Sequence, residues 1–249
     1  MKLPVIEGIV ERRLLVNYRV DPGVVGTMIP APFRPQLVNG WAVAGICLIR
    51  LGHLRPNGWP RQVGLRSENA AHRIAVEWDD PQSRDGTATG VYIPRRDTGS
   101  LPNALIGGRL FPGEHHRAKF TNQETADTLR VAFVSTDRTV SVDVVVEPAD
   151  NLGDSRLFHD VDEASAFFQQ GSVGYSATGR GHQLDGLELR TNAWQAHPAR
   201  VTSVRSTFFD SADQFPPGTA TLDCALLMRG VPVTWHPRQP LHLPAGQNT

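Results

Sequence analysis

Hydrophobic and polar residues alternate along most of this chain in short runs that turn residues separate. Between residues 8 and 19 the apolar side chains fall mainly on one parity, which predicts a strand. Asn39-Gly40 separates two apolar runs, as in a tight hairpin. In all, this alternation predicts about ten strands. The later ones are residues 69–78 and the segments TGVYIP, HHRAKF, LRVAFV, TVSVDVVVE, LDGLELR, VTSVRSTFF, LDCALLM and VPVTWH.

Helix signals are few and short. Asp21 followed by Pro22 predicts a helix that begins with an aspartate cap and continues to Met28. Asp160 is placed to cap a second helix over residues 161–170, where apolar residues recur at helical spacing before Gly171. A third short helix is plausible from Gly99-Ser100 to Leu105. The tail from Pro237 is expected to be irregular.

The order of these elements favours an α+β fold that is mostly β. Hairpin spacing dominates, so antiparallel pairing is expected, in one large sheet that curls or closes. No repeat, heptad or linker divides the 249 residues. We therefore expect a single domain over residues 1–249, since this length suffices for one large core.

Composition narrows the classes of partner. Lys plus Arg equals Asp plus Glu at 25 each, which argues against a general binder of nucleic acid or of anionic membranes. No apolar run approaches the roughly 20 residues of a membrane helix, and early Glu7 and Glu11 do not fit a secretory signal. We expect a cytoplasmic protein in which Cys47 and Cys224 are buried thiols.

Several common catalytic motifs are missing. The chain has no GxGxxG after a strand, no Walker A loop, no HExxH and no GxSxG. The segment GYSATG has the wrong glycine spacing for a nucleophile elbow, which favours a turn at Ser176. We therefore predict no cofactor and no metal site.

The densest polar segment is residues 92–120. It contains Arg95, Arg96, Asp97, Arg109, Glu114, His115, His116, Arg117 and Lys119. Arginines beside histidines suit the binding of a carboxylate and the movement of a proton near pH 7. The alternative is a solvated hairpin end with scattered surface ion pairs.

Strand parity distinguishes the residues of HHRAKF. If this segment is extended, His116 shares its face with Ala118 and Phe120 and points inward, whereas Lys119 points outward. His116 is then either a proton carrier or a hydrogen-bonded core residue. Lys2 and Lys119 are the chain's two lysines, so amine chemistry in the body of the protein would need Lys119.

Glu68 stands where the strand over residues 69–78 begins. A carboxylate in that place could act as a general acid or base if it faces a cavity. The alternative is a charge at a strand end on the surface.

Larger segments of the chain resemble a known family. RRLLVNYRVDPGVVGTMIP, SENAAHRIAVEW, GVYIPRRDTGS, GSVGYSATG and LDCALLM are similar to the DUF2071 family of uncharacterised proteins, related to acetoacetate decarboxylase. The resemblance implies a cone-like antiparallel β-barrel with an interior cavity and a few flanking helices. In the decarboxylase a lysine forms a Schiff base, and a glutamate and an arginine line the pocket.

The resemblance also shows where this sequence differs from the decarboxylase, at the positions of its lysine pair. Glu68 lies in a segment similar to the one that carries the decarboxylase glutamate. The Tyr-Pro step before the decarboxylase lysine pair is similar to Phe111-Pro112, but Gly113 and Glu114 follow here. A shifted register that reaches Lys119 leaves Ala118 in place of the second lysine.

Three functions remain open, and the sequence does not decide whether the chain is an enzyme. The first is acid–base chemistry on a small carboxylate or keto acid without a Schiff base, in which Glu68 and His116 handle protons. The alternatives are a non-catalytic binding or accessory protein, and a decarboxylase-like lyase that uses Lys119. The predicted substrate-binding residues are Arg95, Arg96, Arg109, His115 and Tyr175. An exposed strand edge could also support a homodimer.

Overall fold

The computed structural model describes residues 4–100, 113–178 and 183–243. The described part is mostly β. Its strands are β1 (Ile6–Val20), β2 (Arg34–Pro35), β3 (Leu37–Val38), β4 (Trp41–Pro56), β5 (Leu65–Asp79), β6 (Thr87–Thr98), β7 (His115–Glu124), β8 (Leu129–Ser135), β9 (Ser141–Pro148), β10 (Val173–Ala177), β11 (Gln183–Arg190), β12 (His197–Ser206) and β13 (Ala220–His242). Its helices are α1 (Pro22–Met28), α3 (Val161–Gln170) and the 3₁₀ turn η1 (Arg61–Val63).

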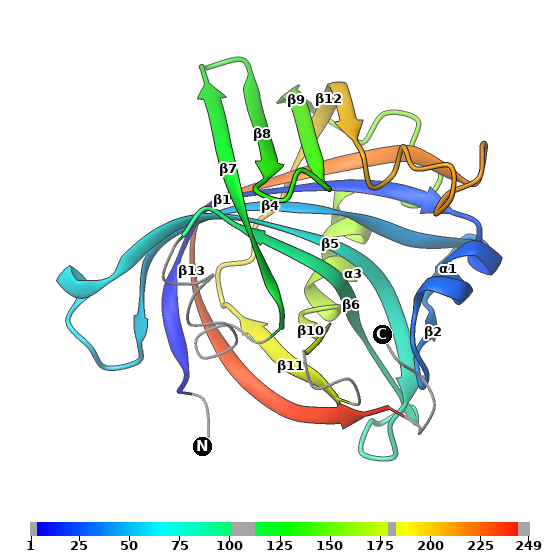
Figure 1. The fold of residues 1–249 in the computed structure, drawn as a ribbon, viewed down its shortest axis with the longest axis horizontal. Coiled ribbons are helices and arrows are strands. Elements are labelled where there is room, and N and C mark those ends of the chain that lie inside the picture. The colour runs from blue at the N-terminus through cyan, green and yellow to red at the C-terminus, as the bar shows by residue number, and fades with distance from the viewer. Residues whose placement is uncertain (1–3, 101–112, 179–182, 244–249) are drawn as a thin grey trace.

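Seven of these strands pair into a closed ring. β1 pairs with β4, β4 with β5, β5 with β6, β6 with β10, β10 with β11, β11 with β13, and β13 with β1. The long strand β13 makes closure possible, because its residues from Ala220 to Trp235 pair with β1 and those from Thr234 to His242 pair with β11. Figure 1 shows β13 curving around one side of the ring.

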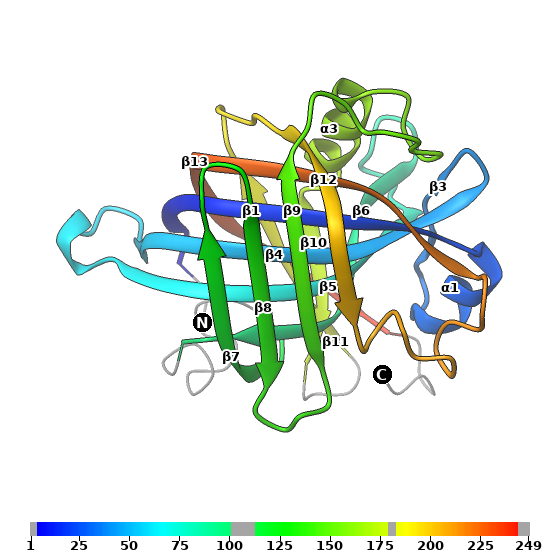
Figure 2. The same ribbon diagram turned by 90° about the horizontal axis from the view of Figure 1, so that it is seen from above.

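A second layer lies across the ring. β7, β8, β9 and β12 form a ladder that starts from β6 and returns to β13, and Figure 2 shows these strands running crosswise over β1, β4 and β5. Large apolar side chains fill the space between the layers, among them Leu14, Ile46, Phe133 and Val142. The opposite face of β1 and β4 packs on α3 through Leu15 and Phe168. Because both of its faces are covered, β4 is a nearly continuous apolar run from Trp41 to Ile49.

The predicted helix caps are present. Asp21 Oδ1 accepts hydrogen bonds from the backbone N–H groups of Gly23 and Val24, and Asp160 Oδ1 accepts from Glu163. Glu163 Oε2 in turn accepts from the backbone N–H of His159. These contacts satisfy orphan donors at both helix starts, which explains why such short helices begin where the sequence predicts.

The turn at Asn39-Gly40 also agrees with prediction, since both residues have positive φ. Other expectations need correction. The pairings of β10 with β6 and of β6 with β7 are parallel rather than antiparallel. The segment after Pro237 is the paired end of β13 rather than an irregular tail. The two strands expected before it, LDCALLM and VPVTWH, belong to the same strand β13. Ser176 lies in β10 rather than in a turn.

Three further expectations have plain outcomes. The short helix expected up to Leu105 lies outside the described residues. Within the described residues, no helix has the length and apolar character needed to cross a membrane. Cys47 and Cys224 are both buried and free, as expected.

Candidate functional site

A cavity of about 140 Å³ lies inside the ring. Every ring strand contributes lining residues, and β7, the C-terminal end of α3 and the loop after β11 complete the wall. In Figure 1, α3 lies behind the ring strands. Much of the wall is apolar, including Ile49, Ile93 and Leu187, and a smaller number of polar side chains also line it. An apolar cavity with a few convergent polar groups is the usual form of a small-molecule site.

Strand register aligns several of the lining residues. Cys47, Ala71, Arg96 and His115 are successive Cα partners across β4, β5, β6 and β7. Side chains in one such row point to the same face of the sheet. Because Ala71 is small, the row leaves space between Cys47 and Arg96. The cavity floor therefore has a thiol at one end and a guanidinium beside an imidazole at the other.

Arg96 is the first of three cavity arginines. Its Nε donates to Ser176 Oγ at 3.0 Å. Burial lowers the pKa of Arg96 to about 10, so the side chain carries its charge at neutral pH. Gly113 lies close by, and a Cβ atom there would come within 2.6 Å of the Ser176 Cβ. Glycine at this position lets the chain pass beside the Arg96–Ser176 contact.

Arg73 is the second, and it is 4% exposed. Its guanidinium reaches over Gly45, which is its register partner, and Nη2 donates to Asn17 Oδ1. Its guanidinium carbon lies 4.5 Å from the centre of the Phe168 ring of α3. The Nε atom has no hydrogen-bond partner. Burial lowers the pKa of Arg73 to about 10, which again leaves a buried cation at pH 7.

Arg13 is the third. Its Nε donates to Cys47 Sγ at 3.4 Å, and its guanidinium carbon lies 5.5 Å from the centre of the Trp194 ring. Arg13 shares a face of β1 with Leu15 and Asn17, which point into the ring interior. Arg13 therefore lies on the cavity side of β1.

None of these three arginines forms an ion pair within the described residues. Residues 101–112 and 179–182, which fall outside them, contain no Asp or Glu. Asp97 is the one carboxylate among the described lining residues, and Arg95 binds it with Nε at 3.1 Å and Nη2 at 3.0 Å. Within the described part of the chain these three guanidinium groups thus have no carboxylate partner, and a buried charge without a partner is costly. A bound anion would provide the missing partner.

His115 adds a basic nitrogen to this cationic wall. Its Nδ1 lies 3.1 Å from the carbonyl oxygen of Gly113. A carbonyl can only accept, so Nδ1 carries the hydrogen and Nε2 keeps its lone pair. Burial, and next the charge of Arg96, lower the pKa of His115 to about 4. At pH 7 His115 is a neutral imidazole that can accept a proton.

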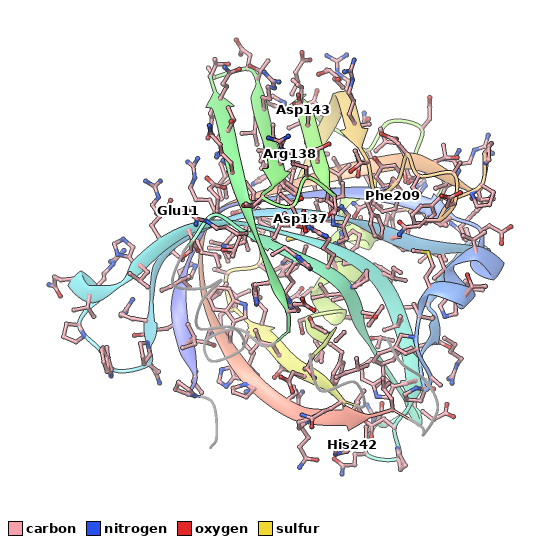
Figure 3. The ribbon with its side chains drawn as sticks, in the orientation of Figure 1. Glu11, Asp137, Arg138, Asp143, Phe209 and His242 are labelled. Atoms are coloured by element: carbon pink, nitrogen blue, oxygen red, sulfur yellow. The ribbon has the colours of Figure 1, made fainter. Side chains whose placement is uncertain are left out.

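His116 lies on the other face of β7. As parity predicts, it shares that face with Ala118 and Phe120, but the cavity is on the opposite side and His116 does not line it. Its side chain is 32% exposed, and Nδ1 lies 3.6 Å from Asp137 Oδ2. Figure 3 shows Asp137 near the crossing of the two layers and His242 at the bottom of the view.

Arg95 is also on that outer face. It contacts Asp97 and Asp137, so both its nearest anions belong to the protein. Of the two adjacent arginines predicted to bind substrate, the structure brings Arg96 to the cavity and leaves Arg95 in an ion-pair network.

Glu68 lies outside the cavity lining. Its two carboxylate oxygens accept hydrogen bonds from Arg12 Nη2, at 2.7 Å, and from Arg50 Nε. Arg12 is 1% exposed, and its Nε and Nη1 have no partner. Glu68 therefore compensates a buried arginine on β1.

Two further predicted residues, Tyr175 and Lys119, are also away from the cavity. Tyr175 packs against Trp78 and Phe33 in an aromatic cluster. Lys119 is exposed, as parity predicts, and does not line the cavity. Arg109 lies outside the described residues. The described residues hold no cluster of three or more side chains suited to a metal ion.

Comparison with known proteins gives a family and a fold. The family model DUF2071, described as an uncharacterised conserved protein, matches residues 10–232. No curated protein matches the sequence. Acetoacetate decarboxylase from Legionella pneumophila is similar in structure, with a TM-score of 0.59 at 11% identity over 97% of this chain and 87% of that one.

Two further solved structures share the fold. An acetoacetate decarboxylase-like enzyme from Sphingomonas wittichii RW1 matches with a TM-score of 0.59 at 13% identity, over 98% of this chain and 94% of that one. The enduracididine biosynthesis enzyme MppR, in complex with pyruvate, matches with a TM-score of 0.57 at 12% identity, over 99% of this chain and 93% of that one.

Proposed function

The chain belongs to the DUF2071 family of uncharacterised proteins, and from its cavity we propose that it binds a small carboxylate and moves a proton on that ligand. In this proposal the ring acts as a cone-like barrel around the ligand. The apolar wall holds the body of the ligand, and the arginines hold its carboxylate. The structural neighbour MppR is described in complex with pyruvate, a small keto acid, which supports a ligand of this class.

One observation carries the proposal: Arg13, Arg73 and Arg96 line an apolar cavity with no carboxylate partner among the described residues. Guanidinium groups bind carboxylates through paired N–H donors. In a cavity with little water such contacts are stronger than on the surface. Arg73 and Arg96 each have one N–H engaged by a neutral acceptor, which fixes the guanidinium without neutralising it.

His115 is the base of the proposed reaction. Nε2 takes a proton from the carbon next to the ligand's carbonyl, and the electron pair of the C–H bond moves to the carbonyl oxygen as an enolate. Arg96, the register partner of His115, stabilises that oxygen. Return of the proton from the imidazolium to carbon completes the exchange, with no net change in oxidation state.

The described lining offers no amine for Schiff-base chemistry. Lys119 is exposed, and no other lysine occurs within the described residues. Proton movement by an imidazole needs no imine, because the guanidinium charge can stabilise the enolate directly.

Hydrogen–deuterium exchange tests this function. The C3 methyl group of pyruvate is followed by proton NMR in D₂O with and without the protein. We expect the protein to accelerate loss of the methyl signal and His115→Gln to abolish the acceleration. Arg130→Gln, at an exposed residue paired with Asp143, is the matched control and should retain it. Equal exchange with wild type and His115→Gln would remove His115 from the mechanism.

A further inference from the structure

Cys47 lies on the cavity floor, in the same register row as Arg96 and His115. It is 7% exposed, and that row separates it from Arg96 by Ala71 alone. Adjacent strands are about 4.8 Å apart, so two strand spacings place the backbones of Cys47 and Arg96 roughly 10 Å from each other. A short ligand whose carboxylate contacts Arg96 would therefore lie over Ala71 with its far end near Cys47 Sγ.

Independent contacts point to an anion beside this thiol. Arg13 Nε donates to Cys47 Sγ at 3.4 Å. Arg73, 4% exposed, also lines the cavity, and its Nε has no hydrogen-bond partner. The thiol thus contacts one guanidinium group and shares the cavity with two more, all of them suited to bind a carboxylate.

We propose that Cys47 is a covalent capture site for small carboxylates that carry an electrophilic carbon. The proposal rests on the proposed function, because the arginines must first bind the carboxylate. Binding then holds the electrophilic carbon beside Sγ, which raises its effective concentration at the thiol.

The chemistry needs no further reactant. With an α,β-unsaturated acid, Sγ forms a bond to the β-carbon, the π electrons move to the α-carbon, and the proton lost from the thiol is delivered there. The product is a thioether, and the addition needs no external oxidant or reductant. With iodoacetate, Sγ forms a bond to the methylene carbon, iodide leaves with the bonding pair, and the thiol proton goes to buffer.

Cys224 provides an internal control. It is also buried and free, but it does not line the cavity, and its Sγ accepts a hydrogen bond at 3.6 Å from Asn17 Nδ2. Burial raises the pKa of the Cys224 thiol to about 12. We expect no selective labelling there.

The experiment compares iodoacetate with its neutral analogue iodoacetamide. Labelling of the intact folded protein is followed by mass spectrometry with peptide mapping, and glutathione in parallel corrects for intrinsic reactivity. We expect Cys47 to favour iodoacetate by about tenfold after this correction, the effect of one charge-assisted hydrogen bond. Excess propionate should suppress the preference. Cys47→Ser should lose the adduct and Cys224→Ser should retain it.

A corrected preference at or below one, absence of labelling at Cys47, or equal labelling of Cys224 would overturn the proposal. Calorimetric titration of the same wild-type protein with propionate distinguishes failure of covalent capture from failure of carboxylate binding. If propionate binds but Cys47 shows no preference for iodoacetate, covalent capture fails while carboxylate binding stands. If propionate does not bind, the proposed function itself fails.

Discussion

Arg95 and Arg96 are neighbours on β6, yet their guanidinium groups lie on opposite faces of the sheet. Arg95 is held by Asp97 and Asp137, whereas Arg96 faces the cavity with Ser176 as its neutral partner. Arg95 therefore belongs to the structure's own charge network. Arg96 retains unpaired positive charge, which is the property that a carboxylate site needs.

Replacement of Arg96 by methionine should leave the protein as stable or more stable. Methionine fills a similar volume, and the substitution removes a cation that has no carboxylate partner. We expect the free energy of urea unfolding to rise by about 1 kcal/mol, which is typical of a stabilising substitution at a functional site. A loss of more than about 3 kcal/mol would mean that Arg96 has a structural partner, since that is the cost of breaking a buried ion pair.

Glu68→Gln should lower the stability of the protein and leave carboxylate binding unchanged. The substitution leaves Arg12 buried without its counter-charge, so we expect a loss of about 3 kcal/mol in the free energy of unfolding. Because Glu68 lies outside the cavity, the folded fraction should bind carboxylates with unchanged affinity. Urea unfolding and calorimetric titration give the two quantities. A large loss of affinity with little loss of stability would return Glu68 to the binding site.

The burial of His72 without hydrogen-bond partners predicts that the fold loses stability in acid. The side chain is fully buried against Phe208, both ring nitrogens lack partners, and burial, with the charge of Arg95 as a lesser cause, lowers the pKa of His72 to about 3. The unfolded chain takes up this proton near pH 6.5, so stability present above that pH is lost as the pH falls toward about 3. His115, whose pKa is lowered to about 4, adds to the same loss.

His72→Leu should reduce this pH dependence. We expect it to raise the free energy of unfolding at pH 7 by about 1 kcal/mol, because it removes unsatisfied buried polar atoms. Between pH 6.5 and 5 the variant should lose less stability than the wild type does. His197→Leu, at an exposed position, is the control. Parallel stability curves for wild type and His72→Leu below pH 6.5 would contradict the assignment.

Ala71→Leu should close the cavity. Ala71 is the small residue between Cys47 and Arg96, so a larger side chain occupies the space in which the ligand would lie. We expect carboxylate affinity to fall by at least about tenfold with little change in the free energy of unfolding, because the larger side chain enters existing space. Circular dichroism confirms the fold, and titration calorimetry measures the affinity. Unchanged affinity would place the ligand elsewhere.

Much of the fold could be predicted from sequence because local signals agree with it. The alternation in β9 places Val142, Val144 and Val146 on one buried face, and Asp21 and Asp160 mark both helix starts. A sheet that curls or closes was expected, but which strands close the ring could not be predicted, since this depends on long-range pairing of β11 with β13. The parallel pairs of β6 escaped prediction for the same reason, because their partners are far apart in the chain.

The sequence predicted the types of side chain in the candidate site better than it predicted which residues line the cavity. Arginine and histidine do line one cavity, at Arg96 and His115, which are among the predicted substrate-binding residues. The predicted Arg95 and His116 lie on the other face of the sheet. Parity assigned the faces of β7 correctly and could not show that the cavity lies on the less apolar one. Arg73 was missed although a charged residue within the apolar run AAHRIAV is itself a signal.

Calorimetric titration of pyruvate and of its neutral analogue pyruvamide into the wild type and Arg96→Met, at pH 7, tests carboxylate binding most directly. We expect pyruvate to bind the wild type at least about tenfold more tightly than pyruvamide, and Arg96→Met to lose most of that difference. Arg130→Met should retain it, because Arg130 is exposed and paired with Asp143. Equal affinity of the wild type for pyruvate and pyruvamide would contradict the account.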